Sequence, residues 1–130
     1  MTDGYILGID YGNKRIGLAL AHSVAKLPHP YSTITQDEHA VNAIKQICDD
    51  EKVQQLVVGL PRNMDGSLGA QADVCEKFGK QLAAAISLPV YFAEEALSSV
   101  AAHNTAAADI DATAAATILE RYFNEGAVEL

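Results

Sequence analysis

The feature that most constrains the fold is a carboxylate between two apolar, strand-forming runs near the N-terminus. Residues 5–10 read YILGID, residues 16–21 read IGLALA, and Gly12 and Asn13 lie in the short stretch between them. Two such runs joined by a turn-forming segment predict a pair of antiparallel strands. Asp10 then lies where the first strand leaves the core, at a strand end open to solvent, a metal ion or a phosphate.

The other residues of this hairpin point in the same direction. Gly8 and Gly12 leave room for a backbone or a ligand to approach closely. Lys14 and Arg15 follow within the same turn, so one short loop offers a metal-type ligand and phosphate-type partners. The alternative for an isolated Asp-x-Gly is a turn in which the Asp caps its own loop.

Length and composition favour a folded globular protein. At 130 residues the chain forms one domain, 1–130, that is large enough to bury a core. Hydrophobic residues make up 49% of it, but polar residues, Gly or Pro interrupt every apolar run before membrane length. The N-terminus lacks the basic start of a secretory signal. We therefore expect a cytoplasmic protein without a membrane partner, in which Cys48 and Cys75 are reduced, structural thiols.

The charge distribution limits where nucleic acid could bind. The net charge of −8 argues against broad, nonspecific affinity for phosphates. From residue 81 to the end, Arg121 is the only Lys or Arg, against seven acidic residues. A nucleic-acid face must therefore be built from the N-terminal two thirds of the chain, with help from bound cations.

Periodicity predicts an α/β order of elements along the rest of the chain. After the hairpin we expect a third strand over 31–35, a helix that opens with Gln36, Asp37 and Glu38, and a strand buried on both faces over 55–59. A loop over 60–67 leads to a helix over 67–86 that Ser67 caps. A last strand starts at 89–92 and runs into Glu94 and Glu95, and the final helix covers roughly 111–123.

Acidic residues recur at comparable places in this order: Asp10 and the pair Glu94 and Glu95 at strand ends, and Asp111 at a helix start. Strand ends and helix starts on one side of an α/β sheet form the usual ligand site. Carboxylates that converge there repel one another unless divalent cations join them. Oxygen ligands without clustered His or Cys favour Mg²⁺ or Mn²⁺. Two such ions can activate water and stabilise the leaving oxygen in phosphodiester hydrolysis.

Four segments of the chain resemble the motif blocks of the YqgF (RuvX) family: GIDYGNKRIG at 8–17, VGLPRNMDGS at 58–67, EEALSS at 94–99 and DATAAATIL at 111–119. They occur in the family's order and span nearly the whole chain. Members of this family are described as Holliday junction resolvases and as nucleases of pre-16S ribosomal RNA.

The resemblance implies an RNase H-like α/β fold, with a central mixed five-stranded sheet flanked by helices. It implies a nuclease that uses Mg²⁺ or Mn²⁺, with two metal ions, in 5′-end maturation of pre-16S rRNA during ribosome biogenesis. Asp10, Glu95 and Asp111 match the family's catalytic, metal-binding positions, and Asp10 is expected to bridge the metals. The implied partners are structured RNA or branched DNA, together with ribosomal particles; the oligomeric state stays open.

The chain departs from the family pattern in two places. The third block has Ala96 where the family has an Arg, and residues 101–110 lack the basic segment that members commonly carry. Both changes remove cations expected near substrate phosphates. Two alternatives therefore stand beside the rRNA nuclease: a Holliday junction resolvase-like DNA nuclease, and a catalytically weak RNA- or ribosome-binding module of the same fold.

Individual assignments also keep alternatives. Only one of Glu94 and Glu95 should point into the site, because successive strand residues face opposite ways. Asp111 is either a metal ligand or a helix N-cap. Lys14, Arg15 and Arg62 either bind substrate phosphates or are solvated surface charges.

Overall fold

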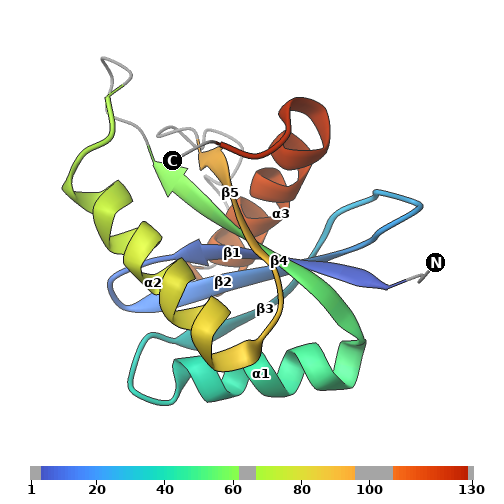
Figure 1. The fold of residues 1–130 in the computed structure, drawn as a ribbon, viewed down its shortest axis with the longest axis horizontal. Coiled ribbons are helices and arrows are strands. Elements are labelled where there is room, and N and C mark those ends of the chain that lie inside the picture. The colour runs from blue at the N-terminus through green and yellow to red at the C-terminus, as the bar shows by residue number, and fades with distance from the viewer. Residues whose placement is uncertain (1–3, 62–66, 96–106, 129–130) are drawn as a thin grey trace.

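The computed structural model describes residues 4–61, 67–95 and 107–128, which form a five-stranded sheet with helices on both faces (Figure 1). The elements in chain order are β1 (Tyr5–Tyr11), β2 (Arg15–His22), β3 (His29–Thr35), α1 (Ala40–Glu51), β4 (Val53–Pro61), α2 (Ala70–Ile86), β5 (Val90–Glu95) and α3 (Ala107–Glu125). No helix in these ranges is long and apolar enough to cross a membrane.

The sheet is mixed, in the order β3-β2-β1-β4-β5. β1 and β2 form the predicted antiparallel hairpin, in which Asp10 lies opposite Gly17, and β3 continues antiparallel on the outer side of β2. β4 runs parallel to β1, and β5 runs parallel to β4. The carboxyl ends of β1, β4 and β5 therefore meet at one edge of the sheet, to which β1 brings Asp10 and β5 brings Glu95.

Alternation along the strands divides the core between the two faces. Leu7 and Ile9 of β1 belong to the larger cluster, which α1 and α2 cover, whereas Ile6 belongs to the smaller cluster under α3. Gly8 and Asp10 follow Ile6 at spacings of two, so they lie on the α3 face. The acidic end of β1 is therefore placed on the side that α3 covers.

Helix α3 packs unusually close to the sheet because the strands beneath it carry glycine. A Cβ on Gly17 of β2 would overlap the backbone carbonyl oxygen of Asp111. A Cβ on Gly8 of β1 would lie 2.6 Å from the Leu119 side chain, and one on Gly59 of β4 would lie 2.5 Å from the Ile118 side chain. The glycines of three neighbouring strands thus form a channel for α3, in which backbone atoms of the helix lie against Gly8 and Gly17 and the Ile118 side chain lies against Gly59.

The starts of the helices differ from the sequence predictions. Helix α1 begins at Ala40, because the Asp37 carboxylate accepts a hydrogen bond from the His39 N–H (2.9 Å) and forms a turn before the helix. Helix α2 begins after Gly69, without a side-chain cap, so the predicted Ser67 cap is wrong. Helix α3 begins at Ala107, so Asp111 lies within the helix and the N-cap alternative is wrong as well.

The glycine channel generates a prediction about stability. We expect Gly17→Ala to lower the free energy of unfolding by at least about 2 kcal/mol, because the new methyl group meets a helix backbone that cannot rotate away. Gly59→Ala is the matched comparison, and we expect it to cost about 1 kcal/mol because it meets the end of the Ile118 side chain. Urea unfolding of both variants measures the difference; equal losses would contradict the backbone contact.

Candidate active site

Asp10 and Glu95 come together across an intervening strand. Asp10 ends β1 and Glu95 ends β5, with β4 between them, and yet their side chains are hydrogen-bonded to each other. Gly59 of β4 makes this possible, since a Cβ there would lie 3.1 Å from Glu95 Oε1. A larger residue at this position would crowd the Glu95 carboxyl group.

The pKa of both carboxyl groups is raised, mainly by burial. Burial raises the pKa of Glu95 to about 9, and the hydrogen bond with Asp10 and the charge of Asp10 add to the effect. Burial also raises the pKa of Asp10, as does the charge of Asp111, while the hydrogen bond from Glu95 acts in the opposite direction. At neutral pH the pair therefore favours holding one proton between its two carboxyl groups.

Asp111 lies beside this pair but contacts a cation. Its Oδ2 atom accepts a hydrogen bond from Arg15 Nε at 2.6 Å. The geometry of β2 accounts for the contact between Arg15 and Asp111. Arg15 precedes Gly17 by two residues in β2, so both lie on the face of the sheet where Asp111 of α3 crosses this strand. In the described part of the chain, no group of three His, Cys, Asp or Glu side chains is gathered closely enough to hold a metal ion.

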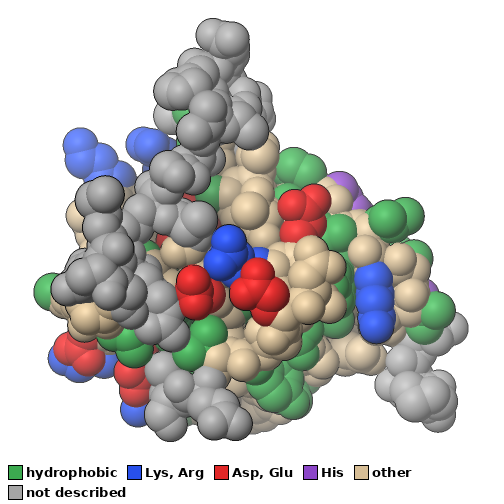
Figure 2. Space-filling view, turned by 90° about the horizontal axis from the view of Figure 1, so that it is seen from above, with side chains coloured by type: hydrophobic (Ala, Val, Ile, Leu, Met, Phe, Trp, Pro, Cys, Tyr) green, Lys and Arg blue, Asp and Glu red, His purple; other side chains and the backbone are tan. Residues whose placement is uncertain are grey.

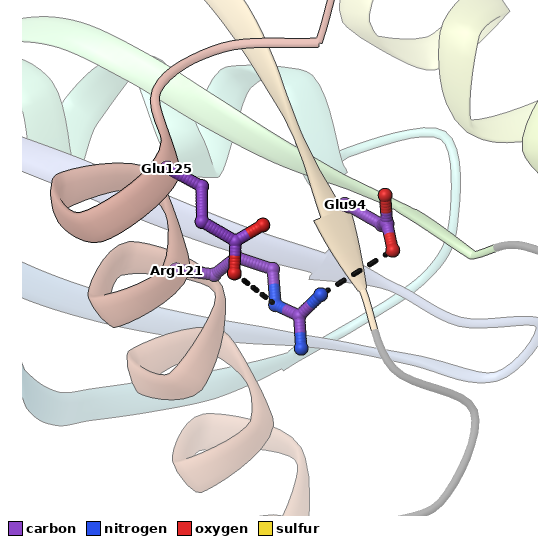
Figure 3. A network of polar contacts seen from close by, with 3 residues as sticks. All are labelled: Glu94, Arg121 and Glu125. Atoms are coloured by element: carbon purple, nitrogen blue, oxygen red, sulfur yellow. Dashed lines mark hydrogen bonds and ion pairs between the residues drawn. The ribbon is translucent and has the colours of Figure 1, made fainter.

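A network of ion pairs around Arg121 shows which of Glu94 and Glu95 faces Asp10 (Figure 3). Glu94 Oε1 lies 3.3 Å from Arg121 Nη1 of α3, and Arg121 Nε lies 3.8 Å from Glu125 Oε2. Glu94 is therefore held against α3, and Glu95 is the acid directed at Asp10. Arg121, the one cation in the last third of the sequence, is engaged by these two acids.

The three predicted phosphate-binding residues have different outcomes. Lys14 and Arg15 are exposed at the hairpin beside Asp10, as predicted, and Arg62 lies outside the described residues. On the face in Figure 2, the described Lys and Arg side chains stand singly or in small groups beside acidic and uncharged residues. Contact with phosphate stays a prediction for Lys14, Arg15 and Arg62.

Cys75 of α2 is a neighbour that the sequence analysis treated only as a structural thiol. It is buried and unpaired with another cysteine, as is Cys48. Burial, followed by the charges of Glu95 and Asp10, raises the pKa of Cys75 to about 12, so the thiol stays protonated and unreactive. The signal in the sequence was its position on the buried face of α2 with Ala72 and Phe78.

A further observation bears on metal binding. Glu95 Oε1 is fully buried and has no hydrogen-bond partner, which is costly for a carboxyl oxygen. A divalent cation is a group that satisfies such an oxygen, and carboxylate ligands suit Mg²⁺ or Mn²⁺. These residues therefore offer the oxygen donors that a hard divalent cation prefers, but as placed the described side chains are not gathered closely enough to hold one.

Comparison with solved structures identifies the fold. Thermus thermophilus RuvC in complex with a Holliday junction substrate matches with a TM-score of 0.61 at 14% identity, over 98% of this chain and 99% of that one. A second Thermus thermophilus RuvC structure matches with a TM-score of 0.55, also at 14% identity, over 95% and 97% of the two chains. The protein thus has the RNase H-like α/β fold that the motifs implied.

Sequence comparison then gives the family. The family model described as "RuvX: Holliday junction resolvase" matches residues 4–125. Relatives named "Putative pre-16S rRNA nuclease" are 36% identical in Chloroflexus aurantiacus (95% of this chain, 89% of the relative) and 42% identical in Moorella thermoacetica (75% and 71%). A third in Trichormus variabilis is 38% identical (91% and 86%). The chain belongs to the RuvX family, which confirms the resemblance.

The shared proton predicts how stability depends on pH without metal. Folding raises the pKa of Glu95 from 4.5 to about 9, so between these values the native state holds a proton that the unfolded chain releases. The free energy of unfolding should therefore fall as the pH rises through this window. Glu95→Gln, which mimics the protonated form, should flatten the profile and be the more stable protein at pH 8. Chemical unfolding in a chelator from pH 5 to pH 9 measures both; parallel profiles would contradict the shared proton.

Proposed function

We propose that this protein is a divalent-metal-dependent nuclease that hydrolyses phosphodiester bonds of pre-16S rRNA during 5′-end maturation. The observation that carries the proposal is the buried Asp10–Glu95 pair with its unsatisfied oxygen, beside Asp111, in a chain of the RuvX family. Without a nearby cation, burying these carboxylates together is unfavourable. Divalent cations would bind to them and offset their repulsion.

Asp10, Glu95 and Asp111 are the residues that would hold Mg²⁺ or Mn²⁺. The ions, when bound, would supply an activated water and stabilise the leaving oxygen. Metal binding would require two changes in the contacts of these residues. The Asp10–Glu95 pair must release its shared proton, and Asp111 must exchange Arg15 for the metal.

Arg15 gains a role from this exchange. Once it leaves Asp111, its guanidinium group is available to a substrate phosphate, which it can bind with two parallel hydrogen bonds. Lys14 next to it, and Arg62, which follows β4 in the sequence, would add phosphate contacts. These cations would partly compensate for Ala96 and for the absence of Lys and Arg from residues 101–110.

The names of the relatives at 36–42% identity favour pre-16S rRNA as the substrate. Such a substrate implies work in the cytoplasm and contact with ribosomal particles. The second candidate is cleavage of branched DNA, which the description of the family model favours. The two candidates share the proposed site and differ in the nucleic acid.

The first test uses Asp10→Asn. We expect the purified protein to cut a pre-16S rRNA fragment with Mn²⁺ or Mg²⁺ and the variant to lose at least a thousandfold in rate, because a residue that would hold the metal loses its charge. Circular dichroism should show an unchanged fold. A four-way DNA junction serves as the competing substrate. Full turnover by the variant, or metal-independent cutting, would contradict the mechanism, and binding without cutting would favour the binding module.

A second test addresses Arg15 without measuring activity. Arg15→Gln should tighten Mn²⁺ binding, measured by calorimetry, at least several-fold more than Lys14→Gln, because only Arg15 competes for Asp111. Both variants remove one positive charge from the same hairpin, so long-range electrostatics is matched. Equal affinities in the two variants would show that Arg15 does not compete with the metal.

A further inference from the structure

A cavity lies at the opposite end of β1 and β4 from the carboxylates. Its volume is about 480 Å³, within the range of sites for small ligands. Its walls come from the starts of β1 and β4, the loop after β2 and the end of α3, namely Ile6, Ser23, Val24, Lys26, Gln54, Gln55, Tyr122, Phe123, Gly126 and Ala127. None of the residues assigned to metal or phosphate in the proposed nuclease site belongs to it.

Two aromatic rings of α3 line the cavity, and contacts hold them in place. The ring centroids of Tyr122 and Phe123 lie 5.8 Å apart, and Tyr122 also lies 6.1 Å from Tyr91 of β5. The Tyr122 hydroxyl accepts a hydrogen bond of 2.9 Å from Gln55 Nε2. The rings are thus oriented before any ligand arrives, which lowers the entropic cost of stacking on them.

The remaining walls are well-defined turns. In the loop after β2, His22 Nδ1 accepts hydrogen bonds from the N–H groups of Val24 (3.2 Å) and Ala25 (3.3 Å), and the Lys26 N–H donates to the His22 carbonyl (2.9 Å). On the other side Gly126, with a φ of 82°, ends α3 and donates to the Tyr122 carbonyl (2.8 Å). The cavity is therefore part of the fold and does not depend on a loose segment.

The polar groups of the cavity suit a nucleotide. The amides of Gln54 and Gln55 and the hydroxyl of Ser23 carry both donors and acceptors, as base edges do. Lys26 is exposed and is the one charged residue among the described residues that line the cavity. In a chain of net charge −8, a cavity whose described wall carries a cation and no carboxylate is a favourable place for a phosphate.

We propose that this cavity binds one unpaired nucleotide of the nucleic-acid substrate, with the base against Tyr122 and Phe123 and the phosphate at Lys26. Unpaired bases are recognised by stacking on aromatic side chains and by hydrogen bonds to their edges. A base within a duplex is stacked on its neighbours and does not enter a cavity of this size. The proposal rests on the proposed nuclease function, since it assigns a second contact to the same substrate.

The cavity lies close enough to the proposed nuclease site for one substrate to contact both. Ile6 on its wall precedes Asp10 by four residues in β1, which is roughly 13 Å along the strand. Both residues lie on the α3 face of the sheet. A substrate whose unpaired segment lies a few nucleotides from the cut would contact both sites, so the cavity would select where the nuclease acts.

The test measures binding of labelled oligonucleotides by fluorescence anisotropy in the Asp10→Asn background. Each duplex is made with and without a single-stranded extension, in RNA and in DNA. We expect Lys26→Gln and Phe123→Leu to weaken binding of the extended duplexes roughly tenfold and to leave the blunt duplexes unchanged. Lys52→Gln is the matched control, because Lys52 is exposed, has the same left-handed φ of 56° and lies outside the cavity.

A loss confined to the extended duplexes, in RNA, DNA or both, supports the proposal. Equal losses for blunt and extended duplexes, or a loss no greater than that of Lys52→Gln, overturn it. Lys26 is exposed, so its variant keeps the test valid even if Phe123→Leu does not fold. Cleavage by the otherwise wild-type protein is measured separately: its absence would refute the nuclease function, whereas the binding comparison would still decide the role of the cavity.

Discussion

The close approach of α3 to the sheet is the constraint on which the rest of the structure depends. Glycine at 8, 17 and 59 lets the helix backbone descend onto three neighbouring strands, and alanines at 112 and 115 keep its underside small. This contact carries Asp111 over Gly17, the residue paired with Asp10. It also brings the C-terminal end of α3 beside the starts of β1 and β4, where the aromatic rings of Tyr122 and Phe123 line the proposed nucleotide cavity.

The arrangement that results is costly for the protein alone. Asp10 and Glu95 are buried together and remain compatible because they share a proton, and the Arg15 guanidinium neutralises Asp111. A protein retains such unfavourable groups where they perform a function, and in the proposed mechanism that function is metal binding. Gly59 contributes to both features, because it accepts Ile118 of α3 and leaves space for Glu95.

The sequence predicted the strands better than the helix starts, for a physical reason. The hairpin, the order of strands and helices along the chain, and the buried β4 follow from apolar periodicity, which packing reinforces. Helix starts depend on which polar group binds which N–H. Asp37 forms a turn ahead of α1, and the N-cap of α2 is Gly69, not Ser67. For the site, Asp10 and Glu95 were predicted and are hydrogen-bonded to each other, whereas the contribution of Gly59 and the proximity of Cys75 were missed.

The sequence by itself determined the strands and helices, the family and the identity of the acids at the strand ends. Local hydrophobic patterns predict the first, and motifs in a known order indicate the other two. Only the tertiary structure decided which acids meet. Asp10 and Glu95 lie on strands that a third strand separates, and Arg15 and Asp111 are 96 positions apart in the chain. Such contacts depend on strand order and on how closely a helix can approach the sheet, and no local periodicity specifies either.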